Sequence, residues 1–155
     1  MLVFLVMGLR PLVAQTVSDS TSVPRVAANR HHAATLSRAD RRSIIAAAKE
    51  LSRRPRAKRD CSHLVHTVYS RAGLPYRYAS SDDLYRGTEP FERVRRPQPG
   101  DLIVWQGHAG IVINPKRHLF FSALSYGPGI DNYYSHYWKH RGMPRFYRYI
   151  RRTDS

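Results

Sequence analysis

The chain has 155 residues, enough for one domain with a modest core, and no apolar run approaches the roughly 20 residues that a membrane-spanning helix needs. Its 26 Lys and Arg residues against 11 Asp and Glu residues give a net charge of +15. This charge favours polyanionic partners such as nucleic acid, acidic lipid headgroups or anionic wall polymers, but it indicates no chemistry. The single cysteine, Cys61, excludes an internal disulfide, so it is buried filler, a reactive thiol or an intermolecular link.

The N-terminal part has the pattern of a targeting segment. Residues 1–9 are apolar, and small Ala14 could end a cleavage region, so we predict a signal peptide over residues 1–15. The basic region that usually begins such a segment is missing. Residues 16–37 lack periodicity and are interpreted as a linker, which leaves one domain over residues 38–152. We therefore expect a secreted or periplasmic protein.

Two helices are predicted at the start of this domain. The first is capped by Ser37, and its apolar residues recur at helical spacing to about Ser52. The second is capped by Asp60 and ends at Gly73. This assignment places Cys61 on the first turn of the second helix.

The rest of the domain is predicted to be mostly short strands. After a short helix capped near residues 80–83, strands are expected at 101–105, 108–113, 119–124 and 146–150, with a turn over 126–129. Helices followed by a meander of strands indicate an α+β fold, with the N-terminal helices packed on one side of a small antiparallel sheet.

The predicted place of Cys61 suits a reactive thiol. The N–H groups and dipole of a helix N-terminus favour a thiolate and are expected to lower the thiol pKa. Arg56, Lys58 and Arg59 add positive charge nearby. The same N–H groups could stabilise an oxyanion as it forms.

A nucleophilic cysteine needs a base from elsewhere in the fold. Of the eight histidines, His108 stands out because it opens a predicted strand directly after Gly107. Its small neighbours Ala109 and Gly110 are expected to leave room for a substrate beside the ring.

Three short motifs, in this order, resemble those of the NlpC-type cell-wall cysteine peptidases. The segment Asp60-Cys61-Ser62-His63-Leu64-Val65, with Tyr69 and Ala72-Gly73 downstream, is similar to their nucleophile helix. The segment Pro99-Gly100-Asp101-Leu102 resembles a strand of the family, and Gly107-His108-Ala109-Gly110-Ile111 resembles the strand that carries its histidine. Together the motifs cover about residues 44–124.

The resemblance implies a papain-like fold in which Cys61 is the nucleophile and His108 the base. The third catalytic position of the family, usually a histidine on the next strand, aligns with Ser122, which could accept a hydrogen bond from His108. The resemblance also implies a substrate among the peptide stems of peptidoglycan, often at a D-glutamyl–diaminopimelate bond. Two features depart from the family pattern: His63 stands where glycine is usual, and the aromatic-Gly-Gly segment that usually precedes the cysteine is absent.

Residues beside the nucleophile and the base are expected to contact substrate; they are Ser62, His63, Trp105 and Gly107. Trp105 would do so as a pocket wall, with a core position as the alternative. We expect no metal and no cofactor, because the histidine pairs 63/66 and 136/140 have no Cys or acidic cluster to complete a zinc site.

The sequence therefore predicts a secreted cysteine hydrolase, an endopeptidase or amidase, that cleaves amide bonds in peptidoglycan stem peptides through a thioester. One alternative is a wall-binding module on the same fold that has lost turnover. Another is a basic nucleic-acid-binding protein, although no recognition motif for nucleic acid is present. Anionic wall polymers are the expected further partners, and a monomer is expected.

Overall fold

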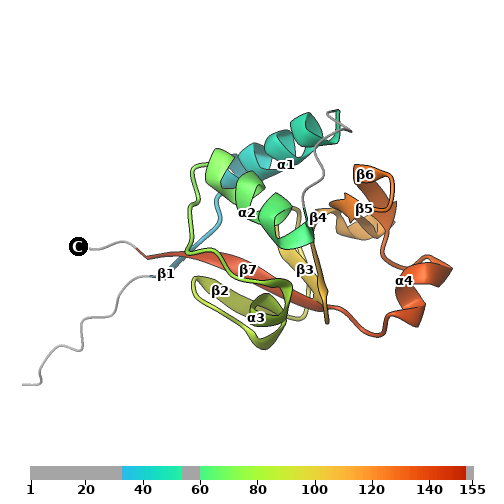
Figure 1. The fold of residues 1–155 in the computed structure, drawn as a ribbon. Coiled ribbons are helices and arrows are strands. Elements are labelled where there is room, and N and C mark those ends of the chain that lie inside the picture. The colour runs from blue at the N-terminus through green and yellow to red at the C-terminus, as the bar shows by residue number, and fades with distance from the viewer. Residues whose placement is uncertain (1–32, 54–59, 153–155) are drawn as a thin grey trace, which may run out of the picture. The chain divides into compact units, whose positions relative to one another are not determined.

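The computed structural model describes residues 33–53 and 60–152 (Figure 1). The predicted signal peptide, most of the predicted linker and the arginine-rich stretch before Cys61 lie outside the described residues. The elements are β1 (Ala33–Thr35), α1 (Arg38–Ser52), α2 (Cys61–Arg71), α3 (Ser81–Arg86), β2 (Phe91–Val94), β3 (Leu102–Trp105), β4 (His108–Asn114), a 3-10 turn (Pro115–Arg117), β5 (Leu119–Leu124), β6 (Gly127–Asn132), α4 (His136–His140) and β7 (Arg145–Arg152).

The helices begin where their capping residues predict. The Ser37 hydroxyl accepts the N–H of Asp40 at 3.1 Å, and the Asp40 carboxylate accepts the N–H of Ser37 at 2.9 Å. The Asp60 carboxylate accepts the N–H of His63 at 2.9 Å, which starts α2 at Cys61.

The strands form one antiparallel sheet in the order β1-β7-β3-β4-β5-β6, with β2 also paired to β7. β3 to β6 are a meander, and the last strand, β7, returns to pair with β3. The α+β class is therefore confirmed. Residues 33–35, which were assigned to the linker, form an edge strand on β7, so the folded unit includes residues before 38.

The turn predicted over residues 126–129 is wrong in its position. Gly127, Pro128 and Gly129 belong to β6, where Gly129 pairs with Ser122 of β5. A Cβ atom on Gly129 would lie 2.9 Å from the Tyr126 ring and 3.1 Å from Leu124. The glycine therefore permits a close approach within a strand rather than a turn.

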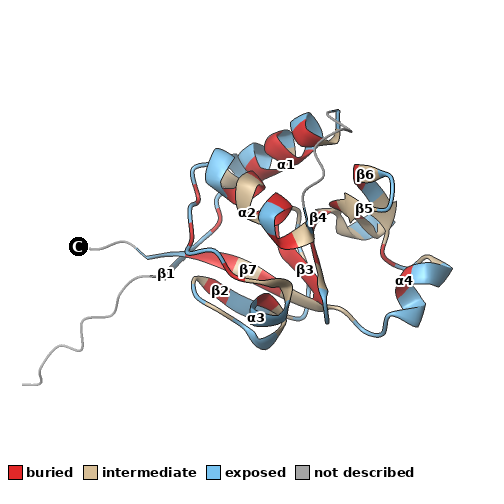
Figure 2. Cartoon of the chain, in the orientation of Figure 1, coloured by how far each residue is buried: buried red, intermediate tan, exposed pale blue. Residues whose placement is uncertain are grey.

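Alternate residues of the central strands enter two separate cores. The strand β3 is buried along its whole length (Figure 2). One face, covered by α1 and α2, holds Leu102, Val104, Ala109, Ile111 and Phe121. The other face holds Ile103, Trp105, Val112 and Phe120, packed against Tyr133 and the α4 residue Trp138. The prediction of helices on one side of the sheet is thus correct for α1 and α2 and misses α4, whose five residues are too short to show a helical period.

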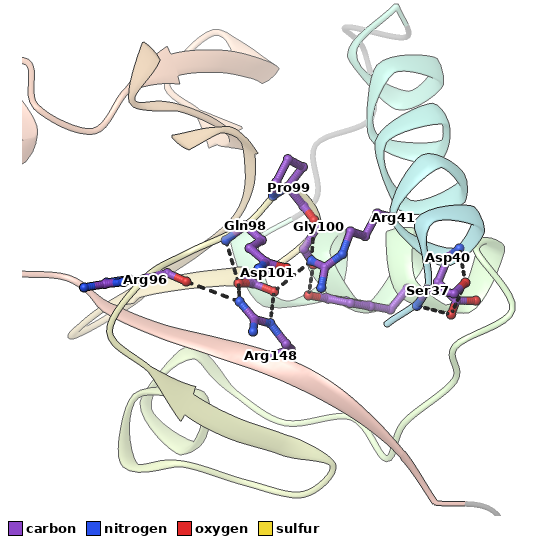
Figure 3. A network of polar contacts seen from close by, with 10 residues as sticks. Ser37, Asp40, Arg41, Arg96, Gln98, Pro99, Gly100, Asp101 and Arg148 are labelled. Atoms are coloured by element: carbon purple, nitrogen blue, oxygen red, sulfur yellow. Dashed lines mark hydrogen bonds and ion pairs between the residues drawn. The ribbon is translucent and has the colours of Figure 1, made fainter. Parts of the chain in front are cut away.

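A buried carboxylate connects three parts of this frame (Figure 3). Asp101 is fully buried; it accepts two hydrogen bonds from the Arg148 guanidinium of β7, at 2.7 and 3.0 Å. Arg41 of α1 lies 3.5 Å from the same carboxylate. Asp101 also accepts the N–H of Gln98 at 2.7 Å, which fixes the turn into β3. Its role is to hold the sheet, a turn and a helix together.

Candidate active site

Cys61 is the first residue of α2 and is half-buried at the edge of the larger core. Burial raises the pKa of its thiol, and the negative charge of Asp60 raises it further. The N–H group of Ala109 approaches the sulfur from β4 and, with the N–H groups of Ser62 and Cys61, lowers the pKa in part. The net direction is upward, so the expected lowering by the helix N-terminus is outweighed by burial.

The helix α2 packs against β4, so Cys61 lies near the start of that strand. His108, the neighbour of Ala109, is the first residue of β4 and pairs with Trp105 across the β3–β4 hairpin. The structure therefore joins the cysteine and the histidine motifs, which are 47 positions apart in the sequence (108 − 61).

The His108 ring lies on two indoles. Its centroid is 4.7 Å from the Trp138 ring and 6.2 Å from the Trp105 ring. Burial, and then the positive charge of Arg141, lower the pKa of His108 from 6.5 to about 4. At neutral pH the ring is therefore uncharged, as a base must be.

Ser122 of β5 connects the His108 ring to the backbone. Its hydroxyl lies 2.8 Å from His108 Nε2 and donates to the carbonyl of Ala109 at 2.6 Å. A hydroxyl has one proton. Because that proton is used on Ala109, the oxygen can serve His108 only as an acceptor, so Nε2 carries the ring proton and Nδ1 is the free, basic nitrogen.

The expected room beside His108 is not at Gly110. A Cβ atom there would lie 2.7 Å from the Phe120 ring, so the space is filled and the glycine is explained by packing. Gly107, at a φ of 72°, makes the tight turn before His108, and its N–H donates to Asp82 of α3 at 3.2 Å.

The predicted substrate contacts beside the nucleophile form a polar cluster around Asp60. The Ser62 hydroxyl donates to Asp60 at 2.8 Å and lies 2.9 Å from the Tyr78 hydroxyl. The His63 ring is 2.6 Å from the Asp60 carboxylate and tilts over the Tyr78 ring, with centroids 4.3 Å apart. Desolvation raises the pKa of Asp60, but the hydrogen bonds from His63 and Ser62 outweigh it and lower the pKa overall. His63 is exposed and Ser62 is buried.

Trp105 is only 1% exposed, so it lies beneath the site. Its indole donates to the carbonyl of Gly142 at 3.1 Å and supports the His108 and Trp138 rings from below. Of the two positions considered for this residue, the structure places it in the core.

A cavity of about 500 Å³ opens beside His108. It is lined by the start of β4, the end of β5, the β5–β6 turn, one residue of β6 and two residues of α4; these residues are His108, Ala123, Leu124, Ser125, Tyr126, Asp131, Tyr137 and Trp138. Apart from His108, the sequence did not indicate these residues as part of a site, because the turn was predicted at 126–129 and no helix was predicted over 136–140.

No group of three or more His, Cys, Asp or Glu residues within the described ranges could hold a metal ion. The His136 and His140 rings of α4 lie with their centroids 4.1 Å apart, but no third candidate ligand among the described residues joins them.

The model of the NlpC/P60 family matches residues 49–145, which is more than half of the chain. The chain belongs to the NlpC/P60 family. Two solved structures support the fold of this NlpC/P60 chain. A protein from Staphylococcus aureus, described as similar to a lipoprotein of the NLP/P60 family, superimposes with a TM-score of 0.58 at 19% identity, over 74% of this chain and 43% of that one. An NlpC/P60 family protein from Bacillus cereus superimposes with a TM-score of 0.55 at 18% identity, over 79% of this chain and 42% of that one.

The NlpC/P60 chain thus spans about two fifths of the length of these two structures. No curated protein matched it. In the described part of the chain no helix is long and apolar enough to cross a membrane.

Proposed function

We propose that this NlpC/P60 chain is a cysteine peptidase that hydrolyses an amide bond in the stem peptides of peptidoglycan. Family membership supports a peptidase-like function at the cell wall. The observation that carries the proposal is the His108–Ser122–Ala109 chain of hydrogen bonds, which holds an uncharged imidazole beside the backbone N–H that approaches the Cys61 sulfur.

The proposed reaction is acyl transfer through a thioester. His108 Nδ1 takes the thiol proton as the Cys61 sulfur attacks the amide carbonyl, and the N–H groups of Cys61 and Ser62 stabilise the oxyanion. The C–N bond then breaks, and His108 returns the proton to the leaving amine. Water hydrolyses the thioester with His108 again as the base, which releases the acid and restores the thiol.

Cys61 and His108 can rest either as a neutral thiol and imidazole or as a thiolate–imidazolium ion pair. The raised pKa of Cys61 and the lowered pKa of His108 favour the neutral state. The pair rests as thiol and neutral imidazole, and the ion pair forms during the attack. Ser122 acts as a positioning residue, because it contacts His108 and not the reacting atoms.

The presence of one cysteine makes a labelling experiment unambiguous. The protein is treated with increasing iodoacetamide, and the remaining hydrolysis of a stem peptide is plotted against the fraction of alkylated Cys61. A straight line that falls to zero at one equivalent is expected. Alkylated protein that still hydrolyses the peptide would rule out Cys61 as nucleophile. Untreated protein that binds the peptide without cleaving it would favour the binding-module alternative.

Anionic wall polymers are proposed as a second partner, on the outer side of α1. A groove of about 560 Å³ there is lined by Arg38, Arg42 and Lys49, with Ile45 and Pro99 among the other residues. The three cationic side chains form no ion pair with any residue that the structure describes, so they are available to an anion. Export to the wall is part of this proposal and is tested by fractionating cells that express the full chain.

A further inference from the structure

A short segment, residues 78–82, contacts both halves of the candidate site. Its first side chain, Tyr78, contacts the residue that follows Cys61, and its last, Asp82, contacts the residue that precedes His108. The nucleophile is carried by α2 and the base by the β3–β4 hairpin, which are separate parts of the chain. The segment therefore lies where it can set the separation of the two.

At the nucleophile end, the Tyr78 hydroxyl lies 2.9 Å from the Ser62 hydroxyl. Ser62 gives its one proton to Asp60 at 2.8 Å, so Tyr78 donates and Ser62 accepts. The Tyr78 ring also tilts over the His63 ring, with centroids 4.3 Å apart. Tyr78 is thus bound to the first turn of α2, which carries Cys61.

At the base end, Asp82 lies in the first turn of α3, and its carboxylate accepts the N–H of Gly107 at 3.2 Å. Gly107, at a φ of 72°, makes the turn from β3 into β4. The hydrogen bond therefore fixes the backbone from which the His108 side chain projects.

The helix α3 is a firm support for this contact. It packs on β3 and β4, and its Tyr85 carbonyl accepts hydrogen bonds from Arg145 at 2.8 Å and from Tyr147 at 2.7 Å, both on β7. The Arg145 guanidinium also lies over the Tyr85 ring, 4.0 Å from its centroid. Because α3 is held by the sheet independently of Asp82, that side chain can position the hairpin.

We propose that Tyr78 and Asp82 are positioning residues that act together as one clamp and fix the distance between the Cys61 sulfur and the His108 ring. Acyl transfer depends steeply on that distance, because a misplacement of about 1 Å can cost about a hundredfold in rate. Both side chains are exposed, so their loss should cost little stability. This inference rests on the proposed function, because it assigns residues that support that site.

The test is a double-mutant cycle on the full chain, with hydrolysis of L-alanyl-γ-D-glutamyl-L-lysyl-D-alanine as the readout. Tyr78→Phe and Asp82→Ala should each lower kcat by about tenfold, with KM and the midpoint of urea unfolding close to wild type. Because either change releases the clamp, the double variant should also lose about tenfold and not about a hundredfold. Asp82→Asn keeps an oxygen that accepts the Gly107 N–H, so it should recover most of the kcat.

The matched controls are Tyr134→Phe and Glu92→Gln, two exposed residues outside the segment, which should keep the wild-type kcat. A hundredfold loss in the double variant would mean two independent contacts and would overturn the clamp. So would an unchanged kcat in either single variant, or a loss in Asp82→Asn as large as in Asp82→Ala.

Alkylation of Cys61 by iodoacetamide at neutral pH separates this inference from the proposed function. A base in reach of the thiol assists the reaction, so wild type should be alkylated faster than His108→Ala. If wild type shows this excess but hydrolyses no peptide, the proposed function fails and alkylation decides the question. Loss of the excess in both Tyr78→Phe and Asp82→Ala supports the clamp. Full excess in either variant, or no excess in wild type, overturns it.

Discussion

The Ser122 hydroxyl lies 2.8 Å from His108 Nε2, and its own proton is used on the Ala109 carbonyl. A small, fully buried side chain therefore fixes both the orientation of the imidazole and the nitrogen that carries its proton. The family-based expectation that Ser122 stands at the third catalytic position has a concrete geometry to test.

Ser122→Ala should lower kcat/KM by about ten- to hundredfold. The lost hydrogen bond is made to a ring that becomes charged in the transition state, and such bonds contribute about 1.5 to 3 kcal/mol. The loss should fall mainly on kcat, with KM little changed, because Ser122 contacts the base. Ser70→Ala, on the exposed side of α2, is the matched control and should retain wild-type kinetics. A loss confined to KM would contradict the positioning role.

The pH profile of kcat/KM should be flat from about pH 5 to about pH 9. His108 acts only when neutral, and its pKa of about 4 keeps it neutral above that pH. Activity should therefore be lost only as the pH falls toward 4. The raised pKa of Cys61 places the alkaline limit above the ordinary thiol value of 9.0. An acid limb near pH 6.5 would mean that His108 is not held neutral by its surroundings.

Arg141→Gln should move the acid limb to higher pH. The positive charge of Arg141 lowers the pKa of His108, so its removal raises that pKa, while burial, the larger cause, remains. The limb should therefore shift part of the way toward 6.5. Arg93→Gln, an exposed charge on β2, should leave the limb unchanged. A profile that does not move in Arg141→Gln would exclude this electrostatic effect.

Asp101→Asn should destabilise the fold by about 3 kcal/mol without a direct effect on chemistry. The substitution leaves Arg148, largely buried against residue 101, without its counter-charge. The free energy of unfolding in urea measures the loss. Glu89→Gln, which breaks an exposed pair with Arg152, should cost less than about 1 kcal/mol. Equal losses in the two variants would contradict the structural role of the buried pair.

Loss of charge from the α1 groove should weaken binding to walls that carry anionic polymer. The double variant Arg38→Gln/Arg42→Gln is expected to sediment less with such walls at low salt, and salt should reduce wild-type binding. Arg77→Gln/Arg95→Gln removes two exposed charges elsewhere and serves as the control. Binding that is insensitive to salt would argue against an anionic partner.

The local signals in the sequence predicted the frame of the site well. Ser37 and Asp60 form the helix caps expected of them, so the position of Cys61 at the start of α2 followed from the capping residue. The β3–β4 hairpin, whose second strand begins at His108, was also predicted, because runs of strand-forming residues on both sides of Gly107 indicate a tight turn.

Tertiary effects accounted for what the sequence did not reveal. The pKa of Cys61 depends on its burial, which one-dimensional patterns do not show, and burial outweighs the helix terminus. Gly127 to Gly129 have turn composition but pair with β5, because a neighbouring strand supplies their hydrogen bonds. Asp131 is a single acid with no motif around it, and only the fold brings it beside His108.

Digestion of purified peptidoglycan by wild type and Cys61→Ala, with the soluble products identified by mass, shows directly whether Cys61 is the nucleophile. Ser70→Ala serves as a control for substitution on the same helix. Wild type and Ser70→Ala should release peptide fragments whose masses identify one cleaved amide bond, and Cys61→Ala should release none. The same fragments from Cys61→Ala, at a similar rate, would show that Cys61 is not the nucleophile.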